Sequence, residues 1–228
     1  MRINGKVFVL GLLLLPALAF AAPGLSDLGK KNPGKSIAVV SLSANNYGGA
    51  LGGWNDATGS DLMGSRLNTM LELTEERLAE DWTVVKAETF VANPDFQALK
   101  GVDKDVGLPM LNDNYLPLFC KDRKQLVKAT IDQDLAKQLC EITGANYILV
   151  IYSEWSVATG NMVPTSKALA KNVLSVYDAK GKSIFSGRVD EKGAKNLGAN
   201  GYVVVNEKTI DQWVDAYERG IAKLFKKK

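Results

Sequence analysis

The segment from Tyr147 to Tyr152 constrains the fold of this chain most strongly, because it is an almost unbroken apolar run. A strand of that composition is buried on both faces, so it needs a packed layer on each side of its sheet. We therefore expect a central strand here. Its continuation, Ser153 to Val157, alternates polar and apolar residues and predicts a half-exposed end that carries Trp155.

Three segments show the three- and four-residue spacing of apolar positions that is typical of an amphipathic helix. They lie at about 60–78, at 123–143 and at 209–225, and Gly144 fits the C-cap of the second. Strands are expected at 36–43, 82–91, 147–157, 168–177 and 183–189, with an edge strand at 202–205. This order predicts a single α/β domain, in which about three amphipathic helices pack against a mixed β-sheet.

The first 21 residues have the three parts of a secretory signal peptide. Arg2 and Lys6 supply the positive start, and Ala19 to Ala21 ends the segment with a small-x-small cleavage site. The apolar run between them is about 14 residues, short of the ~20 that a spanning helix needs. We expect cleavage after Ala21, no remaining transmembrane segment, and a mature protein that is periplasmic or secreted.

The rest of the chain is expected to divide into two parts. Residues 22–35 predict an irregular N-terminal arm, because they are rich in glycine, proline and lysine. Residues 36–228 predict the α/β domain, with an insert at about 94–122 that contains scattered apolar residues and a short helix near 94–100.

The chain contains no histidine. This excludes Ser-His-Asp and Cys-His catalysis, histidine-bound zinc and an imidazole pH switch, and we expect no cofactor and no metal. The formal charge is only +3, and the signal segment carries two of the positive charges, so we expect no nucleic-acid partner. The conceivable acid–base groups are Glu154, Asp190 and Lys167, near strand ends.

Cys120 and Cys140 form a candidate disulfide in an oxidising compartment. If 123–143 is one continuous helix, its rise of ~1.5 Å per residue keeps the thiols much farther apart than the ~7 Å that a disulfide allows between Cα atoms. The pair can close only if the chain before the helix folds back along it, or if the helix breaks. Both alternatives stay open.

The long loop at 45–57 is the first candidate for contact with a partner. Tyr47, Leu51 and Trp54 stand in it among glycine and asparagine residues. Long loops in compact domains are often functional, and aromatic side chains are typical anchors of protein interfaces. With Trp155 on the predicted half-exposed strand end, these residues make up the predicted partner-binding surface.

Four segments resemble a family of bacterial envelope α/β domains. They are Lys35–Val40, Ala136–Leu139 with Gly144–Val150 after it, and Leu174–Gly187, the last with an Asp-x-x-Gly hairpin. Members include the curli-secretion pore lipoprotein, lipoprotein activators of penicillin-binding proteins and the N-terminal domain of the Tol-system propeller protein. The resemblance implies a non-catalytic role in assembly or in regulation of a partner. The chain departs from most of these members in having no cysteine after the cleavage site.

We therefore predict an exported, periplasmic, non-enzymatic binding or assembly module that contacts another cell-envelope protein. The sequence does not predict its oligomeric state. Two alternatives remain: a periplasmic hydrolase that works without histidine, and a carrier with a small apolar ligand beneath the insert.

Overall fold

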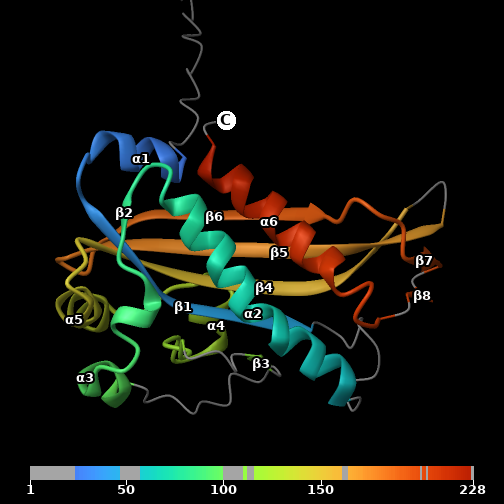
Figure 1. Ribbon diagram of the computed structural model, residues 1–228, viewed down its shortest axis with the longest axis horizontal. Coiled ribbons are helices and arrows are strands. Elements are labelled where there is room, and N and C mark those ends of the chain that lie inside the picture. The colour runs from blue at the N-terminus through green and yellow to red at the C-terminus, as the bar shows by residue number, and fades with distance from the viewer. Residues whose placement is uncertain are drawn as a thin grey trace, which may run out of the picture.

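A computed structural model of the chain describes residues 24–46, 57–99, 110–111, 116–160, 164–200, 202–203 and 205–226. These residues form one mixed sheet with helices against it (Figure 1). The strands are β1 (Ser36–Asn46), β2 (Thr83–Val84), β3 (Met110–Leu111), β4 (Tyr147–Thr159), β5 (Thr165–Asp178), β6 (Ser183–Lys192), β7 (Gly198–Ala199) and β8 (Tyr202–Val203). The helices are α1 (Leu25–Lys31), α2 (Ala57–Leu78), the 3₁₀ helix η2 (Ala87–Thr89), α3 (Pro94–Ala98), α4 (Arg123–Leu126), α5 (Gln133–Thr143) and α6 (Asp211–Phe225).

The predicted fold class is confirmed. The main strand order is β2-β1-β4-β5-β7-β8, with β3 paired to β1 and β6 paired to β5. The pair β1–β4 is parallel, and the pairs β4–β5 and β5–β6 are antiparallel. No helix in the described ranges is long and apolar enough to cross a membrane.

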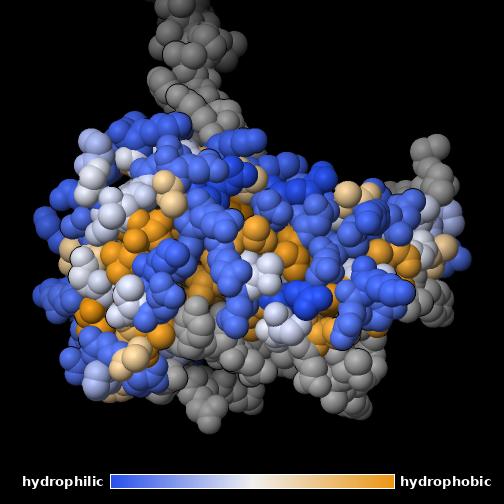
Figure 2. Space-filling view, in the orientation of Figure 1, coloured by the Kyte–Doolittle hydropathy of each residue, from blue (hydrophilic) through white to orange (hydrophobic). Residues whose placement is uncertain are grey.

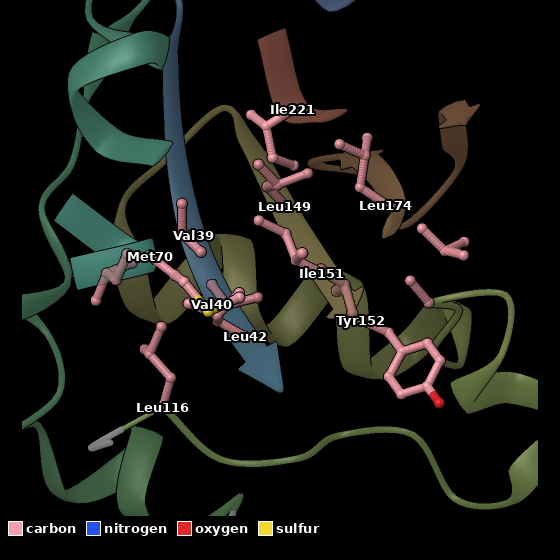
Figure 3. Close-up of a cluster of buried hydrophobic side chains, with 14 of the residues drawn as sticks. Val39, Val40, Leu42, Met70, Leu116, Leu149, Ile151, Tyr152, Leu174 and Ile221 are labelled. Carbon is pink, nitrogen blue, oxygen red and sulfur yellow. The ribbon is translucent and has the colours of Figure 1, made fainter. Parts of the chain in front are cut away.

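The central strand β4 confirms the expectation from the apolar run, since 148–152 is buried throughout. Helices α2 and α6 cover one face of the sheet (Figure 1). The other face is covered around α4 and α5, where Ile131 donates its N–H to the Tyr177 hydroxyl at 3.0 Å and Ser175 donates to the Lys128 carbonyl at 3.2 Å. Apolar side chains from α2, β1, β4, β5 and α6 meet in one buried cluster (Figure 3).

At the end of β4, the structure corrects the expectation that Trp155 is available at the strand surface. Trp155 is fully buried, and its indole N–H donates to the Ser153 hydroxyl at 3.0 Å. The strand continues to Thr159 and is paired with β5 over its whole length, while Trp213 of α6 donates to the Ser156 carbonyl. Trp155 is therefore buried although the pattern alternates, whereas Glu154, Val157 and Ala158 are partly exposed.

The expected irregular arm at 22–35 is also wrong, because Leu25–Lys31 is a helix. Leu25 is completely buried, and the Asp27 carboxylate accepts the Gly24 N–H at 3.2 Å. A Cβ on Gly29 would lie 2.7 Å from the Asp81 carbonyl, so this glycine permits a close approach of α1 to the chain after α2. Seven residues are too few for a helical period to stand out in the sequence.

The predicted helix 123–143 is divided into α4 and α5. Between them Ala129 takes a positive φ of 50°, which ends the first helix, and the second helix ends at Gly144 with a φ of 65° as expected. The predicted strand 82–91 is likewise shortened. Only Thr83 and Val84 pair with β1 before the chain turns into η2.

Candidate interaction surface

The predicted partner-binding residues do not come together on a described surface. Tyr47, Leu51 and Trp54 lie outside the described residues, so their part in partner binding stays a prediction. Trp155 is inside the core, where its side chain contacts no solvent. This fourth residue is therefore removed from the surface that the sequence suggested.

Two of the conceivable acid–base groups lie in one row across the sheet, because Lys171 is in register with Glu154 on one side and with Asp190 on the other. Glu154 forms an ion pair with Lys171 at 2.5 Å, and Lys167 donates to the Ala194 carbonyl. Asp190 pairs with Arg188 at 3.1 Å. Lys167 lies opposite Ala158, farther along β5, so it does not join this row and the three groups named from the sequence do not form one constellation.

The two cysteines are free and buried. Burial, with the charge of Asp122 second, raises the pKa of Cys120 to about 12, and burial with the charge of Asp178 raises that of Cys140 to about 12. Among the described residues no group of three or more Cys, Asp or Glu side chains is arranged to hold a metal ion.

A different surface stands out on helix α2. The helix crosses the sheet with α6 on one side and β2 on the other (Figure 1), and a groove runs along each side of its C-terminal half. Apolar patches are visible among hydrophilic side chains on this face of the molecule (Figure 2). Because the two grooves share the side chain of Glu76, we treat them as one continuous surface and call it the α2 surface.

The groove between α2 and β2 has a volume of about 290 Å³. It is lined by the apolar residues Ala79 and Val84 and by the charged residues Glu72, Glu75, Glu76 and Lys86. The groove between α2 and α6 has a volume of about 220 Å³. Its lining consists of Leu73, Glu76, Arg77, Glu80, Tyr217, Glu218 and Ile221.

The charge of the α2 surface is mostly negative and largely uncompensated. Arg77 is engaged by Glu80 at 2.8 Å, whereas Glu72, Glu76 and Glu218 form no ion pair within the described part of the chain. Because charged groups gathered over apolar walls focus the local potential, this surface attracts cations more strongly than the nearly balanced whole chain does.

Glu75 has a structural role in this surface. Its carboxylate accepts the Ala87 N–H at 2.8 Å, which ties α2 to the beginning of η2. Burial raises the pKa of Glu75 above its ordinary value, although the Ala87 N–H and the charge of Lys86 act in the opposite direction. The geometry holds this carboxylate at the groove wall, while Glu72 and Glu76 remain available to a ligand.

The sequence predicted the helix at about 60–78 but did not identify the α2 surface. The available signal was the four-residue spacing of Glu72 and Glu76, which puts two carboxylates on one stripe of α2. The apolar lining that β2 and α6 contribute, Val84, Tyr217 and Ile221, could not be read from that spacing. Only the packed fold brings them beside the stripe.

Comparison with known proteins gives remote structural neighbours only. No protein family matches the sequence, and no curated protein matches it either. Lipoprotein GNA1162 from Neisseria meningitidis is 18% identical, with 84% of this chain and 99% of that chain covered and a TM-score of 0.36. The hypothetical protein CT253 from Chlamydia trachomatis is 14% identical, with 85% and 92% covered and a TM-score of 0.39. Escherichia coli LpoB is 14% identical, with 83% and 78% covered and a TM-score of 0.35.

These neighbours agree with the resemblance to bacterial envelope α/β domains that the sequence suggested. Their TM-scores are all below 0.5, so they show nothing about the activity or partners of this chain.

Proposed function

We propose that this chain is an exported, non-enzymatic binding or assembly module of the bacterial cell envelope. It acts in the periplasm after loss of its signal peptide, and it contacts another envelope protein through the α2 surface. One observation carries this proposal: apolar groove walls lie beside Glu72 and Glu76 of α2, which form no ion pair among the described residues.

The chemistry of this surface favours a cationic, amphipathic segment of the partner. Apolar side chains of such a segment would cover Ala79 and Val84 in one groove and Leu73 in the other, which removes apolar area from water. Lysine or arginine side chains of the segment would reach Glu72 and Glu76. Charge complementarity of this kind sets specificity and speeds association.

The first test uses purified mature protein and two synthetic peptides of equal length. One peptide is an amphipathic helix of leucine and lysine, and the other replaces each lysine with glutamate. We expect binding of the lysine peptide only, weakened at least tenfold in the double variant Glu72→Gln/Glu76→Gln. The matched control is Glu141→Gln on α5, which removes a carboxylate away from α2. Equal binding of both peptides, or an unchanged affinity in the double variant, would contradict the proposal.

The second test places a photo-crosslinking residue at Ala79 in the living cell, with a control position at Lys182 in the β5–β6 turn. We expect a crosslinked product from position 79 that is lost with Glu72→Gln/Glu76→Gln, and no such product from position 182. A crosslinked product of unchanged yield in Glu72→Gln/Glu76→Gln would contradict binding through the α2 surface. Recovery of the protein from the periplasmic fraction, with a mass that begins at Ala22, tests the location separately.

A further inference from the structure

Strand β6 forms a long border of the sheet. It extends over 10 residues, Ser183–Lys192, and among the described residues it pairs only with β5 (Figure 1). A long border strand offers unpaired N–H and C=O groups to any second strand, so proteins usually shorten, charge or cover it. In this chain the border is long and charged.

The register identifies which backbone groups point outward. Gly193 donates its N–H to the Ala168 carbonyl at 2.9 Å, directly after the last β5–β6 pair. Since bonded and non-bonded pairs alternate along antiparallel strands, odd-numbered residues such as Val189 bond to β5. From Ser186 onward, beyond the register shift near Ile184, the even-numbered residues direct their backbone groups away from the sheet, and all four are exposed: Ser186, Arg188, Asp190 and Lys192.

Helix α6 holds this border in place. Glu191 pairs with Lys223 and, at 3.8 Å, with Arg219. A Cβ on Gly187 would lie 2.8 Å from Leu224, so the strand and the helix are in close contact there. The outward groups are thus presented on a supported strand, which lowers the entropy lost when a second strand is added.

We propose that β6 pairs antiparallel with β6 of a second copy of this chain, with Val189 on the two-fold axis. In this register Arg188 of each copy faces Asp190 of the other, and Ser186 faces Lys192. All four outward-facing residues then lie in hydrogen-bonded pairs, each of which exchanges two N–H···O bonds. The occupant is a second copy because the strand is complementary to itself.

Neighbouring registers lack this match. A two-fold axis on Arg188 brings the two Arg188 side chains together, and an axis on Asp190 brings the two Asp190 side chains together and sets Arg188 against Lys192. Like charges directly opposite each other are destabilising. The charges of β6 therefore disfavour these two registers by repulsion, whereas they attract each other in the register centred on Val189.

The ion pair between Arg188 and Asp190 within one chain does not oppose formation of the dimer. Arg188 and Asp190 are paired within one chain at 3.1 Å, with 60% and 44% of their side chains exposed. Exposed ion pairs contribute little to the free energy of folding. Replacing the pair within one chain by pairs between the two copies therefore costs little.

The test is sedimentation equilibrium of the mature protein over a concentration series. We expect a monomer–dimer equilibrium whose dissociation constant rises more than about tenfold in Arg188→Asp and in Asp190→Arg, because each places like charges opposite each other. The double variant Arg188→Asp/Asp190→Arg exchanges the two charges and should restore the dimer. Lys180→Asp is the matched control, since it makes the same charge change in the β5–β6 turn.

A backbone variant tests the strand pairing itself. Ser186→Pro removes an outward N–H without removing a bond to β5, and should give a monomer with an unchanged circular dichroism spectrum. Three results would overturn the proposal: a wild-type protein that is monomeric at every concentration, a charge-exchanged variant that does not dimerise, or a dimer that tolerates Ser186→Pro. None of these outcomes depends on the α2 surface.

Discussion

The hydroxyl of Tyr217 on α6 donates a 2.7 Å hydrogen bond to the Thr74 hydroxyl on α2, and both side chains are fully buried. The direction follows from a second bond, in which Thr74 donates its own proton to the Met70 carbonyl at 2.7 Å. Burial raises the pKa of Tyr217, so this side chain stays protonated at every physiological pH. The bond fixes the spacing of the two helices that form one groove of the α2 surface.

We expect substitutions of Tyr217 and of Thr74 to lower the free energy of unfolding by different amounts. Tyr217→Phe removes the donor, while Thr74 keeps its bond to Met70, so unfolding free energy should fall by only about 1 kcal/mol. Thr74→Val leaves the Tyr217 hydroxyl buried without an acceptor and should cost about 1–3 kcal/mol. Urea unfolding of both variants and of the double variant measures the coupling. A larger loss in Tyr217→Phe than in Thr74→Val would contradict the assigned direction of the bond.

Gly220 of α6 should not tolerate a side chain. A Cβ there would lie 2.2 Å from the Asn172 amide nitrogen and 3.2 Å from a Val189 methyl group. Asn172 cannot move freely, since it accepts the Ser153 hydroxyl at 2.7 Å and donates to the Tyr217 carbonyl at 3.4 Å. Gly220→Ala should therefore destabilise the protein by about 1–3 kcal/mol, although alanine is the better helix former by about 1 kcal/mol.

Thermal unfolding followed by circular dichroism checks this prediction. Glu218→Ala, on the same helix and exposed, is the control for an alteration of α6 without a new contact. A melting temperature of Gly220→Ala above that of the wild type would show that α6 can move away from β5 without loss.

The architecture was predictable where the apolar pattern continues through a whole element. The stripe of Met63, Leu67, Met70 and Leu71 predicts α2, and all four are buried as expected. The prediction of one helix at 123–143 was wrong, because the apolar stripe continues across the break between α4 and α5, where Ala129 has a positive φ. Hydrophobic spacing records which residues face the core, and it does not record whether the backbone between them stays helical.

The candidate site was less predictable, for two physical reasons. An aromatic residue in an alternating strand can be buried if a neighbouring polar group satisfies it, as Ser153 does for Trp155. The α2 surface depends on how the chain packs, because Val84 of the next strand turns back beside α2 and Tyr217 reaches α2 from α6, which is distant in sequence. Only the glutamate stripe on α2 was visible in the sequence itself.

Glu75 should make stability depend on pH in an unusual direction for a carboxylate. Its pKa in the folded state is raised above the ordinary value of 4.5, so the folded protein binds this proton more tightly than the unfolded chain. The resulting stabilisation is present below the unfolded pKa and is lost as pH rises through the folded pKa. Glu75→Gln keeps an acceptor for Ala87, and we expect it to be more stable than the wild type at neutral pH by less than about 1 kcal/mol.

Urea unfolding at about pH 4 and about pH 7 measures this difference. The advantage of Glu75→Gln should shrink at the lower pH, where Glu75 itself becomes protonated. Glu75→Ala provides the contrast, because it leaves the Ala87 N–H without its acceptor and should be less stable by about 1 kcal/mol at both values. A Gln variant whose advantage grows on acidification would reverse the assigned direction of the pKa shift.

The two thiols should be inert in the folded protein. Cys120 and Cys140 are 1% and 3% exposed, and burial raises the pKa of each to about 12. Because the thiolate is the reactive form, labelling with a disulfide reagent near neutral pH should be at least about a thousandfold slower than for a free thiol. Addition of urea should release both thiols together. A protein that remains unlabelled in urea until a reductant is added would instead contain the disulfide that the sequence left open, and its mass would identify the bond.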